Sequence, residues 1–296
     1  MAHRPVILVA GSLHLDVIVE APGLPRPDQT LTGTAVTYAF GGKGGNQAVA
    51  CARAGALAHM AGAVGTDGFA ATLMAALDGT GVARAGVQTH PGASGMSVAI
   101  VDPAGSYGAV IVSGANLLFA PESTAFPRQC NALILQNEIP EAANLFLARR
   151  AASAGIRVIL NAAPARATAA DLLSLLDLLI VNRGEAADLL GVAEADLHPE
   201  AAARALTALG PKATIVTLGA DGLASDGFRQ PAFPATVIST HGAGDSFIGA
   251  LATEWARGVP LDQAARFAQR AAALHVSTPV VNRAAITEAM IRRHLA

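Results

Sequence analysis

A glycine-rich segment near the C-terminus has the composition of an anion-binding site. Residues 240–245 read Thr-His-Gly-Ala-Gly-Asp and precede a helical pattern. The N-terminus of a helix presents unpaired N–H groups and a partial positive charge, and glycines let the backbone close around a phosphate. Gly242, Ala243 and Gly244 would supply this cradle. Asp245 would then either cap the helix or take a proton from a hydroxyl group that attacks the bound phosphate.

A second glycine-rich segment lies near the N-terminus. Residues 39–46 read Ala-Phe-Gly-Gly-Lys-Gly-Gly-Asn and open into a helical pattern. The segment is not a nucleotide-binding P-loop, because the Gly-Lys pair is followed by Gly44 instead of Ser or Thr. One interpretation is a tight strand-to-helix turn. The other is a loop in which the backbone, Lys43 and Asn46 bring several hydrogen-bond donors close to the hydroxyl groups of a polyol.

Polar residues also follow predicted strands. His14 and Asp16 come after a strand predicted over residues 6–11, and their side chains share one face if the strand continues. Asn182 and Glu185 begin a predicted helix. They would form a capping box, hold Mg²⁺ through its water ligands, or do both, since the two interpretations are compatible.

Two more polar positions lie at strand ends. Glu138 follows a strand predicted over residues 132–136, and a turn at residues 217–222 follows another strand. Because open α/β sheets bind their ligands at the carboxyl ends of the strands, we expect all these groups to gather at one edge of a sheet. Polar groups beside an anion cradle are the arrangement that transfer of a phosphoryl group requires.

Strands and helices alternate most clearly from residue 131 onward, and the strands are nearly continuous runs of Val, Ile and Leu. This alternation predicts an α/β fold, with a central, mainly parallel sheet and helices on both of its faces. A single domain would span residues 1–296. The predicted strands cover residues 132–136, 158–161, 178–181 and 214–218, and the predicted helices cover residues 141–154, 172–176, 185–190, 201–209, 244–257, 261–275 and 284–294.

One excursion interrupts this alternation. It comprises about residues 12–40 together with residues 94–113, and it predicts a small β-sheet that acts as a lid. The strand patterns within it cover residues 15–20, 31–38, 96–101 and 107–112, the last two joined by a turn at residues 102–105.

Composition excludes several other classes of protein. The chain has 296 residues, of which 52% are hydrophobic and 14% charged, with a formal net charge of −2. This balance argues against disorder and gives no electrostatic footprint for nucleic acid. No apolar run reaches the length of about 20 residues that a membrane span needs, and no signal peptide is evident. Cys51 and Cys130 are expected to be buried small side chains in a reducing cytosol, which predicts a cytoplasmic protein.

The two glycine-rich segments and the stretches between them resemble the ribokinase-type carbohydrate kinase family over nearly the whole chain. The segment at residues 242–250 reads Gly-Ala-Gly-Asp-Ser-Phe-Ile-Gly-Ala, and the segment at residues 39–48 ends in Asn-Gln-Ala. The stretches between them that also match, in order, are Gly11-Ser12 with Asp16, residues 113–116, residues 161–165, Asn182 with Glu185, and residues 217–219.

This resemblance implies an ATP- and Mg²⁺-dependent enzyme, a β-sheet lid on an α/β domain, and a homodimer formed through that lid. It implies that Asp245 is the catalytic base and that the backbone of Gly242, Ala243 and Gly244 is the anion hole. The implied sugar contacts are His14, Asp16, Gly42, Lys43, Asn46 and Glu138. The implied nucleotide contacts are Asn182, Thr217, Gly219, Gly222 and Gly244, with Glu185 at the magnesium ion through water.

The chain departs from the family pattern at three places. Position 14 is His, where members of this family usually carry Asn. Ser239-Thr240 stands where Asp-Thr usually helps to bind an activating monovalent cation, and residues 276–281 lack the expected Gly-Ala step. Ser239 and Thr240 are therefore weak candidates for a K⁺ site, and we expect potassium activation to be weakened or lost and the adenine pocket to differ.

Three functions remain to be weighed. The first is phosphorylation of a sugar's primary hydroxyl by ATP, with ribose as the first candidate. The second is a nucleoside kinase of the same fold, which His14 keeps open because an imidazole could stack on something other than a furanose. The third is a sugar- or nucleotide-binding protein without turnover, although a pure binder has no need of Asp245 beside an anion cradle.

Overall fold

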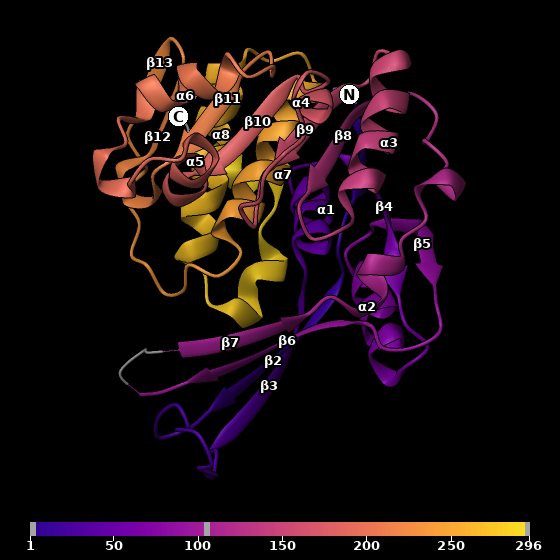
Figure 1. Cartoon of the computed structure of the whole chain (residues 1–296), viewed down its shortest axis with the longest axis vertical. Helices are drawn as coiled ribbons and strands as arrows, with labels where there is room; N and C mark the ends of the chain where they lie inside the picture. Colours follow the sequence, from indigo (N-terminus) through magenta and orange to yellow (C-terminus); the bar gives the residue numbers. More distant parts are fainter. Residues whose placement is uncertain (1–3, 104–106, 294–296) are drawn as a thin grey trace.

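The structure is a computed structural model that describes residues 4–103 and 107–293. Its larger sheet has nine strands in the order β13-β12-β11-β10-β9-β8-β1-β4-β5, and neighbours from β11 to β5 pair in parallel (Figure 1). The strands of this sheet are β1 (Val6–Ala10), β4 (Leu57–Val64), β5 (Ala83–Thr89), β8 (Cys130–Gln136), β9 (Arg157–Asn161), β10 (Leu178–Asn182), β11 (Thr214–Thr217), β12 (Leu223–Ser225) and β13 (Phe228–Gln230).

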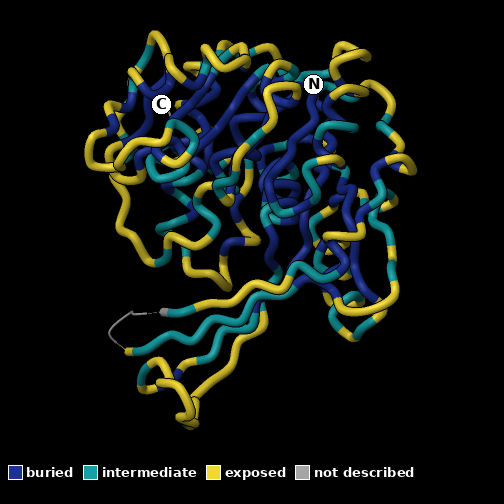
Figure 2. The backbone as a smooth tube through the Cα atoms, in the orientation of Figure 1, coloured by how far each residue is buried: buried dark blue, intermediate teal, exposed yellow. Residues whose placement is uncertain are grey.

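Helices cover both faces of the large sheet, so its central strands are buried throughout (Figure 2). In β1, Ile7 and Val9 belong to one hydrophobic core, whereas Leu8 and Ala10 belong to the other. The first core is closed by α1 (Lys43–Arg53), α2 (Gly68–Gly79), α7 (Ala243–Ala256), α8 (Leu261–Val276) and α9 (Glu288–Arg293). The second is closed by α3 (Glu141–Ser153), α4 (Ala170–Leu173), α5 (Arg183–Leu190) and α6 (Pro199–Thr207).

A separate four-stranded sheet projects from the large one (Figure 1). Its order is β3 (Ala35–Gly41), β2 (His14–Glu20), β6 (Gly95–Val101) and β7 (Tyr107–Val112). Gly95 pairs with His14, and a Cβ atom at Gly95 would lie 2.4 Å from the His14 ring, so this position requires glycine. The expected α/β fold with an additional small sheet is thereby confirmed.

The structure differs from the sequence prediction mainly at the two edges of the large sheet and near the C-terminus. Strand β5 and the antiparallel β12–β13 pair were not expected, and both lie at edges of the sheet, where the hydrophobic pattern is weak. The helix predicted over residues 284–294 begins only at Glu288, after a 3₁₀ helix, η5 (Val280–Ala285). Part of the turn predicted at residues 102–105 and the end of that last helix lie outside the described residues. No helix in the described part of the chain is long and apolar enough to cross a membrane.

Candidate active site

Asp245 lies in the first turn of α7 and accepts hydrogen bonds from two side chains of α1. Gln47 Nε2 donates to Asp245 Oδ1 across 2.9 Å, and Asn46 Nδ2 donates to Oδ2 across 3.3 Å. The N-cap residue of α7, Gly242, has a left-handed φ of 74°, and no side chain caps this helix. The interpretation of Asp245 as a simple helix cap is therefore wrong, because its carboxylate faces α1.

Helices α1 and α7 approach this closely because a glycine stands between them. A Cβ atom at Gly249 would lie 2.5 Å from Ala50 Cβ and 2.8 Å from the Gln47 carbonyl oxygen. The two helix backbones are thus in contact. This contact carries Asn46 and Gln47 to the carboxylate of Asp245.

Gln47 is the centre of a buried amide network that the sequence did not reveal. Its Oε1 accepts a hydrogen bond from Gln136 Nε2 (2.7 Å), and its Nε2 also reaches Asn161 Oδ1 (3.1 Å). Gln136 and Asn161 end β8 and β9, so the network joins two strand ends to Asp245. The sequence feature that could have indicated this role is a Gln in a helix whose other residues are mostly small or apolar. The Gln47 side chain is fully buried.

The groups around Asp245 have opposing effects on its pKa. Burial raises the pKa of Asp245 above its ordinary value, and the nearby Glu138 carboxylate raises it further. The Lys43 ammonium group and the hydrogen bond from Gln47 act in the opposite direction. Asp245 is thus a carboxylate with enhanced proton affinity that neighbouring donors keep available as a base.

The second glycine segment turns from β3 into α1 and is anchored by Glu138. Glu138 Oε2 accepts hydrogen bonds from the Lys43 backbone amide (2.9 Å) and from the Ser12 hydroxyl. Gly42 has a φ of 86°, and a Cβ atom there would lie 2.7 Å from the His14 backbone nitrogen. The interpretation as a strand-to-helix turn is therefore correct, and the same turn brings Lys43 into the pocket that contains Asp245.

His14 and Asp16 lie on β2, in the small sheet, and both side chains are buried. His14 Nε2 has no hydrogen-bond partner among the described residues. Asp16 accepts a hydrogen bond from the Ser97 hydroxyl, and its Oδ2 lies 3.5 Å from His241 Nε2. Asp16 raises the pKa of His241, although burial partly opposes this effect. The small sheet therefore contacts the loop that leads into α7, through a histidine to which the sequence gave no role.

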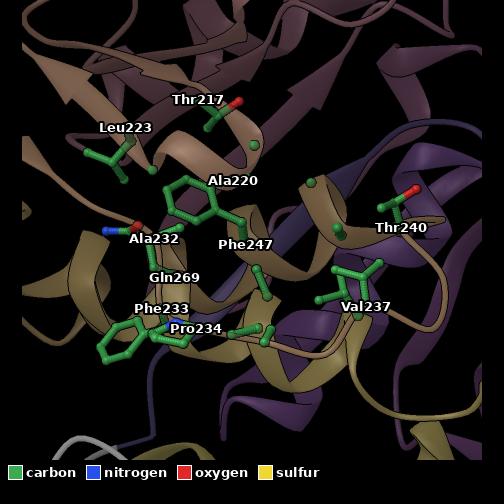
Figure 3. A pocket seen from close by; sticks show the side chains of 18 residues that line it. Thr217, Ala220, Leu223, Ala232, Phe233, Pro234, Val237, Thr240, Phe247 and Gln269 are labelled. Carbon is green, nitrogen blue, oxygen red and sulfur yellow. The ribbon is translucent and has the colours of Figure 1, made fainter.

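An apolar cavity of about 510 Å³ lies beside the N-terminus of α7 (Figure 3). Thr217, Gly219, Gly222 and Gly244, four of the residues for which a nucleotide contact was expected, line this cavity together. Its apolar wall consists mainly of Leu223, Phe233, Pro234, Val237, Phe247 and Val276. Phe233, Pro234 and Val237 belong to a loop that the sequence analysis had not singled out.

A smaller pocket of about 170 Å³ adjoins this cavity, and five residues line both: Thr217, Thr240, Ala243, Gly244 and Phe247. Lys43 and Asp245 line the smaller pocket. Gly242, Ala243, Asn182 and Glu185 line it as well. A ligand in the apolar cavity can therefore extend along the N-terminus of α7 to the carboxylate of Asp245.

The capping box predicted for Asn182 and Glu185 is confirmed. Asn182 Oδ1 accepts from the Glu185 amide (2.8 Å), and Glu185 Oε2 accepts from the Asn182 amide (2.8 Å). Burial raises the pKa of Glu185, while the Asn182 amide and Lys43 lower it. The described residues contain no group of three or more His, Cys, Asp and Glu side chains suited to hold a metal ion.

The candidate monovalent-cation position at Ser239 and Thr240 lies beside a guanidinium group. The Ser239 carbonyl oxygen accepts a hydrogen bond from Arg283 Nη2 (2.9 Å), and Thr240 lines both pockets instead. The sequence analysis assigned no role to Arg283. Ser239, which stands where the family usually has Asp, therefore contacts the Arg283 guanidinium group through its carbonyl oxygen.

Comparison with known proteins identifies the class to which this fold and site belong. A family model described as pfkB family carbohydrate kinase matches residues 5–287, and the chain belongs to that family. It is 33% identical to ribokinase from Haemophilus influenzae over 286 residues, covering 93% of each chain. It is 31% identical to deoxyribokinase from Salmonella typhi over 282 residues, covering 92% of each.

A solved structure, Arabidopsis thaliana ribokinase complexed with ribose and ATP, matches with a TM-score of 0.90 at 29% identity and covers 99% of both chains. The family and these relatives make the protein an ATP-dependent carbohydrate kinase. The expected resemblance is confirmed.

Proposed function

We propose that this kinase transfers the terminal phosphoryl group of ATP to the primary hydroxyl of a pentose, with ribose as the preferred acceptor. The observation that carries the proposal is the position of Asp245. Its half-buried carboxylate lies at the N-terminus of α7 in a pocket that continues into a nucleotide-sized cavity. The relatives named ribokinase support ribose as the acceptor, and the deoxyribokinase relative makes deoxyribose the nearest alternative.

In this mechanism Asp245 is the general base. The acceptor hydroxyl lies between Asp245 and the phosphate, and Asp245 takes its proton as the new O–P bond forms. The amide groups of Gly242 and Gly244 are assigned to the negative charge that develops on the transferred group. Because these donors belong to the start of a helix, they are already oriented and need no rearrangement during the reaction. The Ala243 amide, which the resemblance also implied, donates instead to the Thr240 carbonyl oxygen across 3.1 Å.

The acceptor side of the pocket would be formed by polar groups from both sheets. Asp16, Gly42, Lys43, Asn46 and Glu138 are assigned to the sugar hydroxyls. His14 Nε2 is the remaining specificity group, because it is buried and unpartnered in the described structure. A substrate hydroxyl that hydrogen bonds with this nitrogen would remove the free-energy cost of leaving it unpaired.

The nucleotide side would use the apolar cavity for the base and the smaller pocket for the phosphates. Thr217, Gly219 and Gly222 are assigned to the nucleotide, with Asn182 near its phosphates. Glu185 would hold Mg²⁺ through water ligands, which suits an isolated carboxylate beside a phosphate pocket. When bound, Mg²⁺ neutralises part of the negative charge on the phosphates.

The small sheet is proposed to act both as a lid and as a dimer interface. Its strands β3 and β7 expose an unusual number of large apolar side chains. These are Val36 (52% exposed), Tyr38 (61%), Val110 (67%), Ile111 (58%) and Val112 (48%). Exposed apolar patches of this kind mark interaction surfaces. A second copy of the chain would cover them, and closure over the sugar would exclude water from the phosphate.

A substrate panel tests this function. The ADP released would be measured with ribose, deoxyribose, other pentoses, hexoses and nucleosides as acceptors. We expect the highest kcat/KM with ribose. Preference for a nucleoside would overturn the sugar assignment in favour of a nucleoside kinase. Tight binding of ATP and ribose without any ADP release would instead indicate a binding protein.

A further inference from the structure

Arg283 is a buried cation surrounded by backbone oxygens. It belongs to η5, only 6% of it is exposed, and all three of its guanidinium nitrogens donate hydrogen bonds to carbonyl groups. Nε reaches the Thr278 oxygen at 3.2 Å. Nη1 reaches His241 and Nη2 reaches Ser239, both at 2.9 Å. Each nitrogen of this side chain thus donates one hydrogen bond to the peptide backbone.

The charge of Arg283 is not balanced by a carboxylate. None of the ion pairs within residues 4–103 and 107–293 includes it. The titratable groups on which its charge acts are all basic. The pKa of Arg53 is lowered first by burial and then by Arg283, and Arg283 also lowers the pKa of His241 and of His275. Burial of an unpaired charge costs free energy unless the surrounding dipoles compensate. Here the three carbonyl dipoles provide that compensation, as they do for a dehydrated monovalent ion.

The position of this cation connects it to the anion cradle. Ser239 and His241 belong to the loop that enters α7, and Gly242, the N-cap residue of the helix, follows directly. His275 Nε2 also donates to the His241 carbonyl oxygen, at 2.8 Å. Two side chains, Arg283 and His275, therefore bind the carbonyl groups of this loop. Arg283 carries a permanent positive charge. That charge lies next to the segment assigned to stabilise a phosphate.

We propose that the Arg283 guanidinium group takes the place of an activating monovalent cation, so that this kinase works at full rate without K⁺. The guanidinium fixes the carbonyl groups of Ser239 and His241 and adds positive potential behind the anion cradle. Arg283 is a positioning residue, because it contacts the loop and not the substrate. The proposal depends on kinase activity but not on the identity of the sugar.

The first experiment measures the wild-type enzyme in different salts. Its kcat and KM for ATP would be determined in choline chloride, NaCl and KCl at equal ionic strength, with K⁺-free nucleotide. We expect kcat to vary by less than about twofold among the three salts, because the internal cation cannot be exchanged. Activation by K⁺ of about tenfold or more over choline would overturn the proposal, because a free ion site would then be required.

The second experiment removes the guanidinium group. In choline chloride, Arg283→Ala is expected to lower kcat about 10-fold or more, and guanidinium or K⁺ ions should recover part of the loss by entering the vacated carbonyl cage. The same ions should raise the melting temperature of Arg283→Ala but not that of the wild type, because they bind only the folded variant. This second readout decides the proposal even if none of the sugars tested is turned over.

A matched variant separates this role from simple stabilisation. Arg157 also donates to a backbone carbonyl group, that of Trp255, and stacks on the indole ring at the far end of α7. Arg157→Ala should lower the melting temperature without any dependence of kcat or stability on the cation. Arg283 would be shown to be merely structural if Arg283→Ala lost stability but kept the wild-type kcat in choline, with no effect of guanidinium or K⁺ on either quantity.

Discussion

The side-chain amide of Gln47 donates a hydrogen bond to Asp245 Oδ1 across 2.9 Å, although the two residues are 198 positions apart in the chain. The contact joins the N-terminal halves of α1 and α7, and a glycine, Gly42 or Gly242, is the N-cap residue of each helix. One helix carries groups assigned to the sugar, and the other carries the groups assigned to the phosphate. Their contact therefore determines where the acceptor hydroxyl meets the base.

Replacement of Gln47 should alter the pH dependence of catalysis. The hydrogen bond from Gln47 lowers the pKa of Asp245, so Gln47→Leu should raise that pKa further. Because the base acts in its ionised form, activity falls as the pH falls through this pKa. The acid limb of the kcat/KM profile should therefore move to higher pH by about one unit. Gln88→Leu, a change on the distant strand β5, should leave the limb in place, and an unmoved limb in Gln47→Leu would contradict the assignment.

Replacement of Glu138 should move the same limb in the opposite direction. The Glu138 carboxylate raises the pKa of Asp245, so Glu138→Gln should lower it and extend activity to lower pH. The variant should also weaken sugar binding, because a neutral amide holds the Lys43 amide and the Ser12 hydroxyl less firmly than a carboxylate does. We expect KM for the sugar to increase about 10-fold, while KM for ATP changes little. A shift toward higher pH would show that Glu138 acts on Asp245 by some other route.

Close packing of α1 against α7 predicts a stability effect at Gly249. Alanine is the better helix former, yet Gly249→Ala should destabilise the protein by about 1–3 kcal/mol, because the added methyl group would overlap Ala50 and Cys51. The control is Gly68→Ala in α2, where a Cβ atom would meet nothing within 4 Å. Urea denaturation would show whether Gly249→Ala alone loses stability. Equal stability of the two variants would mean that the helices are not in tight contact.

The two cysteines should be inert in the folded protein. Burial raises the pKa of Cys51 to about 12 and that of Cys130 to about 11. At pH 8 very little of either thiol is the reactive thiolate. A thiol reagent such as dithionitrobenzoate should modify neither residue in the native state and both in urea. Cys51 is buried as expected, whereas Cys130 is only half-buried. Rapid modification of the native protein at Cys51 would contradict its burial.

The sequence predicted those parts of the fold and site that depend on local pattern. Continuous apolar runs such as residues 178–181 predict strands buried on both faces, whereas the edge strands β5 and β13 and the short strand β12 contain no such run. Asp245, Lys43 and Asn46 could be found because each lies in or beside a glycine cluster at the start of a helix. Gln47 and Arg283 could not be found, because their partners are set by the packing of segments that are distant in sequence.

The central claim is that the Asp245 carboxylate accepts the proton of the attacking hydroxyl. The most direct measurement compares kcat of wild type and Asp245→Ala with ATP and ribose, using preparations whose circular dichroism and ATP affinity match. Loss of a general base predicts a fall in kcat of about 10³-fold or more with the fold intact. A folded, ATP-binding Asp245→Ala enzyme that keeps kcat within about tenfold of wild type would contradict the mechanism.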